Sequence, residues 1–258
     1  MSELKWETDI TGINPNKILL RGYAIDKLMG EIPFSSVIFL ALKGELPTDP
    51  ESKMMDAILV SSIDHGATPP SALAARTIAS TGANMNAAIA GGILAISQFH
   101  GGAIEGCMEF LKTGVDKAHN ETISLEEASR KIYDEYKIVK KRIPGFGHRI
   151  HTDDPRTRKL IGMAKELKIA GKHIKFAEIT SKVIKENLGK DLPINVDGAI
   201  AAVSLEMGFP KEIANSFFAI SRITGLVAHA FEEKNKMKVM RKIHPSDHKY
   251  TGNPEREL

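Results

Sequence analysis

Residues 83–99 read ANMNAAIAGGILAISQF, an apolar run that is rich in alanine and glycine. A membrane span needs about 20 predominantly apolar residues. This run is shorter, and it contains two asparagines, a serine and a glutamine. It therefore predicts a buried helix of a globular core, over residues 85–99, rather than a membrane helix.

Apolar residues recur at helical spacing on both sides of this run, whereas strict alternation of apolar and polar residues is scarce. Residues 8–21 predict an extended or turn-rich lead-in, and the tail after Arg241 is polar and irregular. Ser71 is expected to cap a helix that follows two adjacent prolines. The expected helices cover residues 24–29, 34–43, 49–62, 71–80, 85–99, 103–111, 125–141, 155–167, 174–187, 195–207 and 211–233. This pattern predicts an all-α fold.

The composition excludes several classes of function. The chain has 258 residues, a formal net charge of +3 and a single cysteine, Cys107. So small a charge gives nucleic-acid binding no strong electrostatic support. One cysteine excludes a disulfide within the chain and a cysteine-rich metal site, so Cys107 is expected to be a small buried apolar residue. No His-Glu-x-x-His run occurs, and no metal site is expected. The first residues lack an apolar signal segment, which favours the cytoplasm.

Three polar loops each place a histidine next to glycine where an apolar helical run breaks. They read Asp-His-Gly at 64–66, His-Gly-Gly at 100–102 and Gly-Phe-Gly-His at 145–148. Glycine allows a ligand to approach the backbone closely, so His65, His100 and His148 are candidates for a site. The alternative for any one of them is a structural histidine that is satisfied within the core.

Three charged residues lie at predicted helix starts or inside an apolar helix. Arg156 follows Asp-Asp-Pro at a predicted helix start, and Arg222 lies within an apolar helix. Burying a guanidinium is costly unless it is paired. Each arginine is therefore either half of a structural salt bridge or a bidentate clamp on a ligand carboxylate. Asp197 opens a helix of alanines, and it either interacts with the amides of that helix terminus or acts as a general acid or base.

A set of short motifs follows one order along the chain. The set is Arg-Gly-Tyr at 21–23, Gly-Glu-Leu-Pro-Thr at 44–48, the three histidine loops, Asp-Pro-Arg at 154–156, Asn-Val-Asp at 195–197 and Ser-Arg at 221–222. This ordered set resembles the citrate synthase superfamily along nearly the whole chain. The resemblance implies a large helical domain formed by residues 1–102 and 207–258, with a smaller helical domain inserted at 103–206.

The resemblance also implies roles for individual residues. The implied catalytic residues are His100, His148 and Asp197. The implied oxaloacetate-binding residues are His65, Arg156 and Arg222, with Arg241 as the candidate for a third arginine that is donated by the partner subunit. The implied CoA-binding residues are Pro144, Gly145, Phe146, Gly147 and Arg149. The neighbouring cations Lys140, Lys141 and Arg142 are either phosphate contacts or a solvated run of charge.

Within this superfamily the chain most resembles the citryl-CoA lyases, including the C-terminal lyase module of ATP-citrate lyase. It is shorter than most citrate synthases, and Gly66 and Gly198 stand where synthases often have glutamate and an aromatic residue. The implied reaction cleaves citryl-CoA to acetyl-CoA and oxaloacetate through an acetyl-CoA enolate. In it His148 takes the proton of the tertiary hydroxyl, His100 hydrogen-bonds the thioester oxygen and Asp197 protonates the enolate carbon.

The resemblance implies no cofactor beyond coenzyme A as part of substrate and product. The implied partners are citryl-CoA, acetyl-CoA, oxaloacetate, a second copy of the chain in a homodimer or larger homo-oligomer, and a citryl-CoA synthetase of the reductive tricarboxylic acid cycle. Two alternatives stay open. One is a citrate or 2-methylcitrate synthase that condenses an acyl-CoA with oxaloacetate, and the other is a non-catalytic CoA-binding protein on the same fold.

Overall fold

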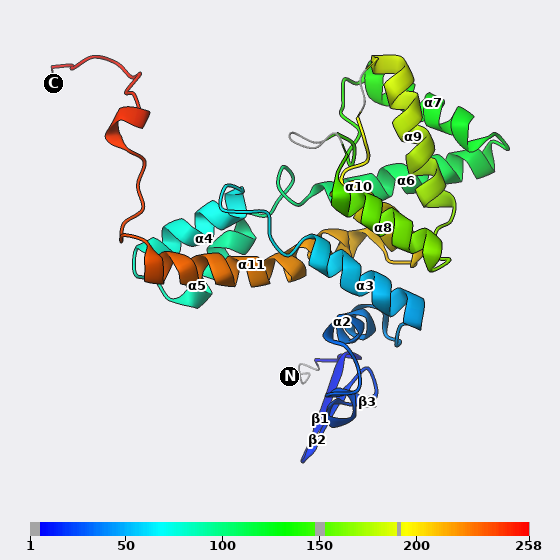
Figure 1. Ribbon diagram of the computed structural model, residues 1–258, viewed down its shortest axis with the longest axis horizontal. Coiled ribbons are helices and arrows are strands. Elements are labelled where there is room, and N and C mark those ends of the chain that lie inside the picture. The colour runs from blue at the N-terminus through cyan, green and yellow to red at the C-terminus, as the bar shows by residue number, and fades with distance from the viewer. Residues whose placement is uncertain (1–5, 148–152, 190–191, 258) are drawn as a thin grey trace, which may run out of the picture. The chain divides into compact units, whose positions relative to one another are not determined.

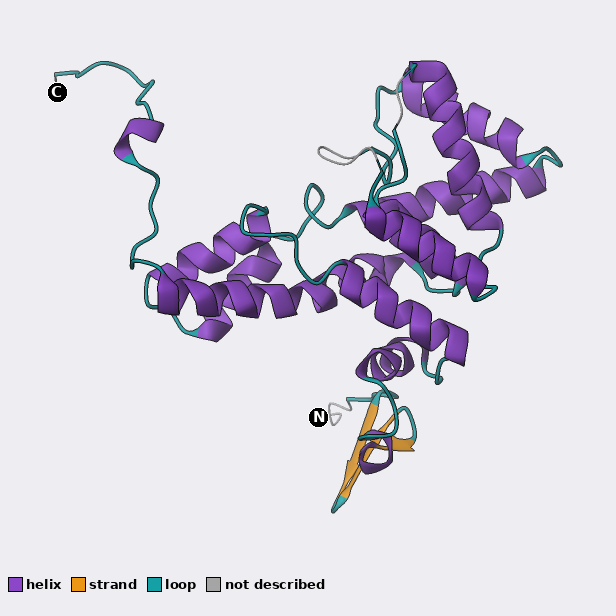
Figure 2. Ribbon diagram, viewed as in Figure 1, coloured by secondary structure: helices purple, strands orange, loops and turns teal. Residues whose placement is uncertain are grey.

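Helices dominate the computed structural model, which describes residues 6–147, 153–189 and 192–257 (Figures 1 and 2). The all-α prediction is confirmed, with one small antiparallel sheet added near the N-terminus. None of the described helices is both long enough and apolar enough to cross a membrane. The chain folds into two units, residues 1–63 with 101–221 and residues 64–100 with 222–258.

The first unit begins with the sheet, where an extended lead-in was expected. Strands β1 (Thr11–Asn14), β2 (Lys17–Leu20) and β3 (Tyr23–Ala24) pair in that order, and Asn14 stands opposite Lys17. The tight turn between β1 and β2 contains Asn16 at a φ of 60°, a conformation that asparagine tolerates better than most residues. The short helix α1 (Ile25–Leu28) follows directly.

The next two helices begin and end where the local sequence predicts. Helix α2 (Phe34–Lys43) ends at Gly44, whose φ of 86° only glycine adopts without strain. Helix α3 (Asp49–Ser61) begins with a complete capping box. The Thr48 hydroxyl accepts from the Glu51 amide, and the Glu51 carboxylate accepts from the Thr48 amide at 2.9 Å.

The rest of the first unit packs around helix α10 (Val196–Glu206), in which residues 198–204 are all buried. Three helices cover it: α6 (Ala103–Asn120), α8 (Pro155–Glu166) and α9 (Lys172–Leu188). Helix α7 (Leu125–Ile138) packs on α6 and α9. The turn η1 (Lys211–Ile213) leads into α11 (Ala214–Lys236), whose residues from Arg222 onward belong to the second unit.

The second unit is built on three helical segments, which are α4 (Pro70–Ser80), α5 (Met85–Leu94) and the C-terminal part of α11. Small side chains allow close packing, because Ala79, Ala88 and Ala230 form one buried cluster. A Cβ on Gly92 would lie 2.8 Å from a methyl carbon of Leu226, so α5 and α11 meet where no side chain fits. The C-terminal tail holds only the turn η2 (Pro245–Asp247) among its described residues.

Several predicted helix limits are wrong, for local reasons in α4 and α5 and for a tertiary reason in α6. Helix α4 begins at Pro70, because proline is tolerated in a first helical turn, and Ser71 lies buried inside it rather than capping it. Helix α5 ends at Leu94, and Ser97 and His100 then exchange backbone hydrogen bonds of 2.9 and 2.8 Å. Helix α6 continues past Gly114, which is a glycine because a Cβ there would lie 2.0 Å from the Phe176 ring.

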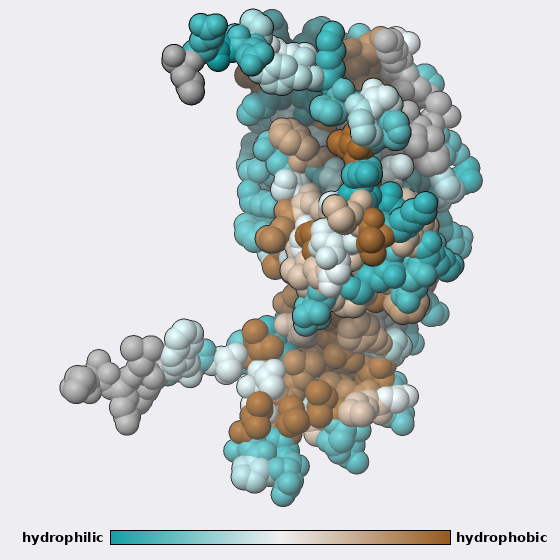
Figure 3. Space-filling view, turned by 90° about the vertical axis from the view of Figure 1, so that its left-hand side faces the viewer, coloured by the Kyte–Doolittle hydropathy of each residue, from teal (hydrophilic) through white to brown (hydrophobic). Residues whose placement is uncertain are grey.

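Large apolar side chains are exposed around the small sheet, α1 and α2. In Figure 3 hydrophobic residues gather in the lower part of the view, where these elements lie. Ile13 is 75% exposed, Met29 71% and Phe34 78%. A contiguous apolar surface of this kind is typical of a region that contacts another protein.

Candidate functional site

The predicted site residues fall into two groups, one in each unit. His65, His100, Arg222 and Arg241 belong to the second unit, and the loop at 144–147, Arg156 and Asp197 belong to the first. His148 and Arg149 lie outside the described residues, so the roles expected of them stay predictions.

A hydrogen bond with a buried serine fixes the orientation of the His100 ring. Its Nε2 lies 2.8 Å from Oγ of Ser71, on the first turn of α4. Burial of the ring, followed by the positive charge of Arg222, lowers the pKa of His100. The imidazole is therefore held neutral at physiological pH, a state in which one nitrogen donates a hydrogen bond and the other accepts one.

His65 lies on an exposed loop that Asp64 organises. The Asp64 carboxylate accepts a hydrogen bond from the Gly66 amide at 2.9 Å and lies 3.0 Å from Nε2 of His229 on α11. Burial opposes ionisation of Asp64, but these contacts outweigh it and lower the pKa of the carboxyl. The side chain next to His65 is thus an anchored anion, while His65 itself is exposed.

Two arginines of the second unit differ in their surroundings. Arg222 is only 2% exposed on α11, which agrees with its position in an apolar run. Arg241 binds its own chain's Glu233, with Nε–Oε1 at 2.8 Å and Nη2–Oε2 at 2.6 Å. The hydrogen bonds from Arg241, together with its charge, lower the pKa of Glu233 below its usual range. That Arg241 also binds a substrate carboxylate stays a prediction.

In the first unit, the loop at 144–147 is pressed against the start of α10. Gly145 has a φ of 85°, and a Cβ there would lie 2.4 Å from Sγ of Cys107 and 2.9 Å from Cα of Gly198. The backbone of Gly147 donates to the Pro193 carbonyl at 2.8 Å, and the amide of Asn195 donates to the Gly145 carbonyl at 3.0 Å. At Gly145 the loop therefore lies where only glycine fits.

Asn195 connects this loop to the helix that carries Asp197. Its Oδ1 accepts from the Gly198 amide at 3.0 Å and caps α10, while its Nδ2 donates to the Gly147 carbonyl at 2.9 Å. Asp197 lies in the first turn of that helix and is partly exposed. Asn195 was expected only as part of the Asn-Val-Asp motif, and its capping role was not predicted, although an asparagine before an alanine-rich helix is a recognisable capping signal.

Cys107 is fully buried, as predicted from the sequence. Burial, followed by the negative charge of Asp197, raises the pKa of this thiol far above its ordinary value. The thiol is therefore inert at physiological pH and acts through packing. Among the described residues, no group of three or more histidines, cysteines and carboxylates could hold a metal ion.

Arg156 takes part in a local ion pair, which is the structural role considered for it. Asp154, only 1% exposed, caps α8 by accepting from the Arg156 amide at 2.9 Å. The same carboxylate accepts from Nε at 3.0 Å and from Nη2 at 2.8 Å. Asp154 thereby fixes the direction of the guanidinium, and the predicted contact with a ligand carboxylate stays untested.

A basic cavity of about 720 Å³ lies between α7, α9 and the loop at 144–147. Its cations are Lys137, Lys140, Lys141 and Arg142. Its remaining lining is aromatic and aliphatic, and includes Tyr133, Tyr136, Phe146 and Leu192. The run of charge at 140–142 thus borders a hollow with an apolar wall. Such a combination suits a ligand that has both a flat ring and phosphate groups.

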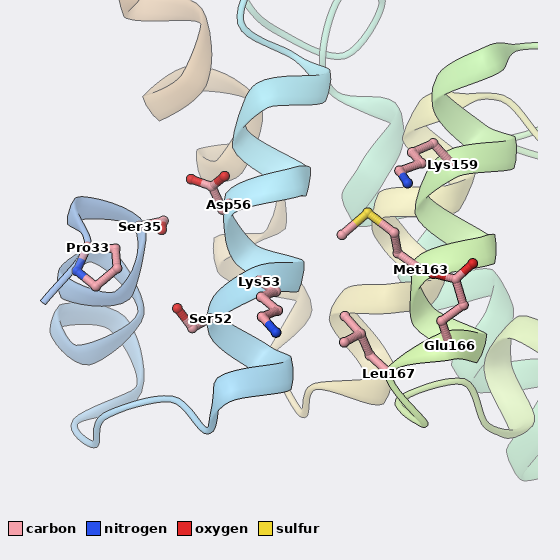
Figure 4. A pocket seen from close by; sticks show the side chains of 9 residues that line it. All are labelled: Pro33, Ser35, Ser52, Lys53, Asp56, Lys159, Met163, Glu166 and Leu167. Atoms are coloured by element: carbon pink, nitrogen blue, oxygen red, sulfur yellow. The ribbon is translucent and has the colours of Figure 1, made fainter.

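A second cavity, of about 570 Å³, lies between α2, α3 and α8 (Figure 4). Its charges balance, because Lys53 and Lys159 share the lining with Asp56 and Glu166. None of the predicted catalytic or substrate-binding residues lines it. We therefore assign it no role in the chemistry.

The chain matches a known family over most of its length. A profile of the family described as "Citrate synthase, C-terminal domain" matches residues 47–243. The chain belongs to the citrate synthase family. The citrate synthase of Heyndrickxia coagulans is 29% identical over 218 residues, which cover 82% of this chain and 55% of that protein. The citrate synthase of Haloferax volcanii is 31% identical over 204 residues, which cover 78% and 51%. The chain thus spans about half the length of these relatives.

Solved structures of this family include a much more similar protein. The structure of citryl-CoA lyase from Hydrogenobacter thermophilus is 46% identical, with a TM-score of 0.90 and coverage of 98% of this chain and 97% of that one. An ATP citrate lyase of Methanosaeta concilii, solved with (3S)-citryl-CoA, has a TM-score of 0.85 at 19% identity and is covered to 43%. At that identity the second likeness shows the fold alone.

Proposed function

We propose that this protein is a citryl-CoA lyase, which cleaves citryl-CoA to acetyl-CoA and oxaloacetate. The observation that carries the proposal is the 46% identity to the Hydrogenobacter thermophilus lyase, over nearly the full length of both chains. The two citrate synthases above are 29% and 31% identical, and this chain covers only about half of each.

The basic cavity of the first unit is the proposed site for the CoA part of the substrate. Phosphate groups bind well to lysine and arginine, and Lys140, Lys141 and Arg142 line the cavity. The adenine ring would lie against Phe146 and the backbone of the loop at 144–147. That loop leads directly to His148, so a bound CoA would bring its thioester arm toward the predicted catalytic residues.

The cleavage itself needs a base, an oxyanion donor and an acid. His148 would remove the proton from the tertiary hydroxyl of citryl-CoA. The carbon–carbon bond then breaks, the hydroxyl carbon becomes the ketone of oxaloacetate, and the electron pair moves to the thioester as an enolate. Asp197 would deliver a proton to the enolate carbon to give acetyl-CoA.

His100 has the properties required of the oxyanion donor. Its pKa is lowered by burial and by Arg222, so the ring is neutral. If Ser71 donates to Nε2, the ring proton lies on Nδ1 and would hydrogen-bond the thioester oxygen. A preorganised neutral donor stabilises negative charge as it develops on the enolate.

The test uses purified protein in two assays. In the first, synthetic citryl-CoA is supplied and oxaloacetate is followed with malate dehydrogenase and NADH. In the second, acetyl-CoA and oxaloacetate are supplied and released thiol is measured. Rapid oxaloacetate release without released thiol supports the lyase, and it should be lost in His100→Ala and Asp197→Asn. Thiol release with citrate as product would instead identify a synthase.

Other parts of the proposal rest on the resemblance and on the exposed apolar surface. We propose that the protein works in the cytoplasm as a homo-oligomer, in which a second copy covers the apolar side chains around Met29 and Phe34. A separate citryl-CoA synthetase would supply the substrate, as a step of the reductive tricarboxylic acid cycle. Sedimentation of the wild type and of Phe34→Glu tests the assembly, since a charge at a buried interface weakens association.

A further inference from the structure

Arg76 is a buried arginine of the second unit that has no role in the mechanism above. It lies on α4 and is only 5% exposed. Its Nε donates to Oε2 of Glu233 at 2.8 Å, and its Nη1 donates to Oε2 of Glu232 at 2.9 Å. Its Nη1 also lies 3.1 Å from Nδ1 of His229. A guanidinium is a rigid fork of donors, so Arg76 holds three side chains of α11 in fixed positions.

One arm of this network leads to the His65 loop. Arginine only donates hydrogen bonds, so Nδ1 of His229 must accept from Arg76 and the ring proton must lie on Nε2. That Nε2–H then donates to Oδ1 of Asp64, at 3.0 Å. Asp64 also accepts from the Gly66 amide, so the two residues that flank His65 are hydrogen-bonded to each other. Arg76 is therefore connected to the loop through His229 and Asp64.

The other arm leads to the segment that carries Arg241. Glu233 is 2% exposed, and its Oε2 accepts from both Arg76 and Arg241. The backbone of the segment is fastened to the end of the same helix as Arg76. The Met240 amide donates to the Ser80 carbonyl at 2.8 Å, and the Arg241 amide donates to the Ser80 hydroxyl at 2.9 Å.

We infer that Arg76 is a positioning residue, which holds the His65 loop and the Arg241 segment in place through one connected network. The inference rests on the proposed function, together with the roles in binding the substrate carboxylates that the family resemblance implies for His65 and, across a subunit interface, for Arg241. Arg76 itself binds no substrate in this arrangement. Its loss releases both segments at once, because Glu233 and His229 lose their common donor.

The first measurement is hydrogen exchange of the folded protein, which reports local opening independently of activity. We compare the wild type with Arg76→Met, Arg76→Lys and the control Arg130→Met. Arg130 is also bound by two carboxylates, Glu126 and Glu186, but it is exposed and lies on α7 in the first unit. The Gly66, Met240 and Arg241 amides should exchange faster in Arg76→Met. Their exchange rates should be intermediate in Arg76→Lys, which keeps the positive charge but lacks the guanidinium, and unchanged in the control.

The second measurement separates the carboxylate end of the substrate from the CoA end. A misplacement of about 1 Å costs on the order of 100-fold in rate, so kcat/KM for citryl-CoA should fall by roughly 10- to 100-fold in Arg76→Met. The dissociation constant of CoA alone should not change, because its proposed cavity lies in the first unit. A variant that is merely less well folded would lose citryl-CoA turnover and CoA binding alike, in proportion to its folded fraction.

Single-arm variants keep the inference testable if Arg76→Met does not fold. Glu233→Gln should speed exchange at Met240 and Arg241 only, and His229→Leu should speed exchange at Gly66 only, each with a partial loss of kcat/KM. Unchanged exchange in all variants would overturn the inference, as would equal losses of citryl-CoA turnover and CoA binding. If the wild type does not cleave citryl-CoA, the proposed function is refuted. If both segments nevertheless exchange faster in Arg76→Met, the positioning role of Arg76 still holds.

Discussion

Replacing Gly145 by alanine should test whether the loop at 144–147 depends on close backbone contact with α10. The substitution has two separable costs. The φ of 85° places a side chain in the left-handed region, which costs about 1–2 kcal/mol. The new Cβ would also lie 2.4 Å from Sγ of Cys107 and 2.9 Å from Cα of Gly198, and such overpacking costs about 1–3 kcal/mol. Gly145→Ala should therefore lower the free energy of unfolding by about 2–5 kcal/mol.

The same loop provides a matched control in Gly147. Its φ of 82° is nearly the same, but a Cβ there meets only a methyl carbon of Leu192, at 3.4 Å. Gly147→Ala should thus cost only the backbone part, about 1–2 kcal/mol. Gly162→Ala is a second control, since a Cβ inside α8 meets nothing within 4 Å. It should stabilise the protein by about 0.5–1 kcal/mol.

Urea unfolding followed by circular dichroism measures all three variants, and titration with CoA reports the effect on the proposed cavity. Gly145→Ala should weaken CoA binding, because relief of the contact with Cys107 must move the loop. Adding Cys107→Ala should restore part of the lost stability. Equal destabilisation by Gly145→Ala and Gly147→Ala would refute the reasoning, since only the close approach to Cys107 and Gly198 distinguishes the two positions.

The remaining predictions concern a cap, a cation and a histidine. Asn195→Ala should cost about 1–2 kcal/mol as a lost cap and lower citryl-CoA turnover, whereas Ser124→Ala, which removes the cap of α7, should destabilise without lowering turnover. Lys141→Glu should weaken CoA binding by roughly tenfold or more, since a charged hydrogen bond is worth about 1.5–3 kcal/mol, and Lys112→Glu on the exposed face of α6 should not. The pKa of His100 is lowered by burial and by Arg222, so the unfolded chain binds this proton more readily than the folded chain. Stability should therefore fall as the pH drops below about 6.5. His100→Gln should weaken the dependence of the urea unfolding midpoint on pH in this range. An unchanged dependence would contradict the lowered pKa of His100.

The limits of α2 and α3 at Gly44 and Thr48 could be predicted from neighbouring residues, whereas the length of α6 could not. Gly44 and Thr48 mark the end of α2 and the start of α3 because the αL conformation and the capping box involve only neighbouring residues. Gly114 favours a break in the sequence, but the Phe176 ring of α9 requires a glycine there and α6 continues. A pattern that counts only local spacing cannot detect that contact.

The residues of the candidate site could likewise be predicted in part from the sequence. The helical class, the family and the side chains with suitable chemistry could be predicted from the sequence, because residue type and motif order carry that information. The groups that surround these side chains depend on how the helices pack, as with Ser71 beside His100, Cys107 against Gly145, and Arg76 bound to Glu233. Arg76 and Glu233 are 157 positions apart, and their pairing arises because α4 and α11 pack closely enough to exclude water. A buried charge must then find its partner in the neighbouring helix, whatever the distance along the chain.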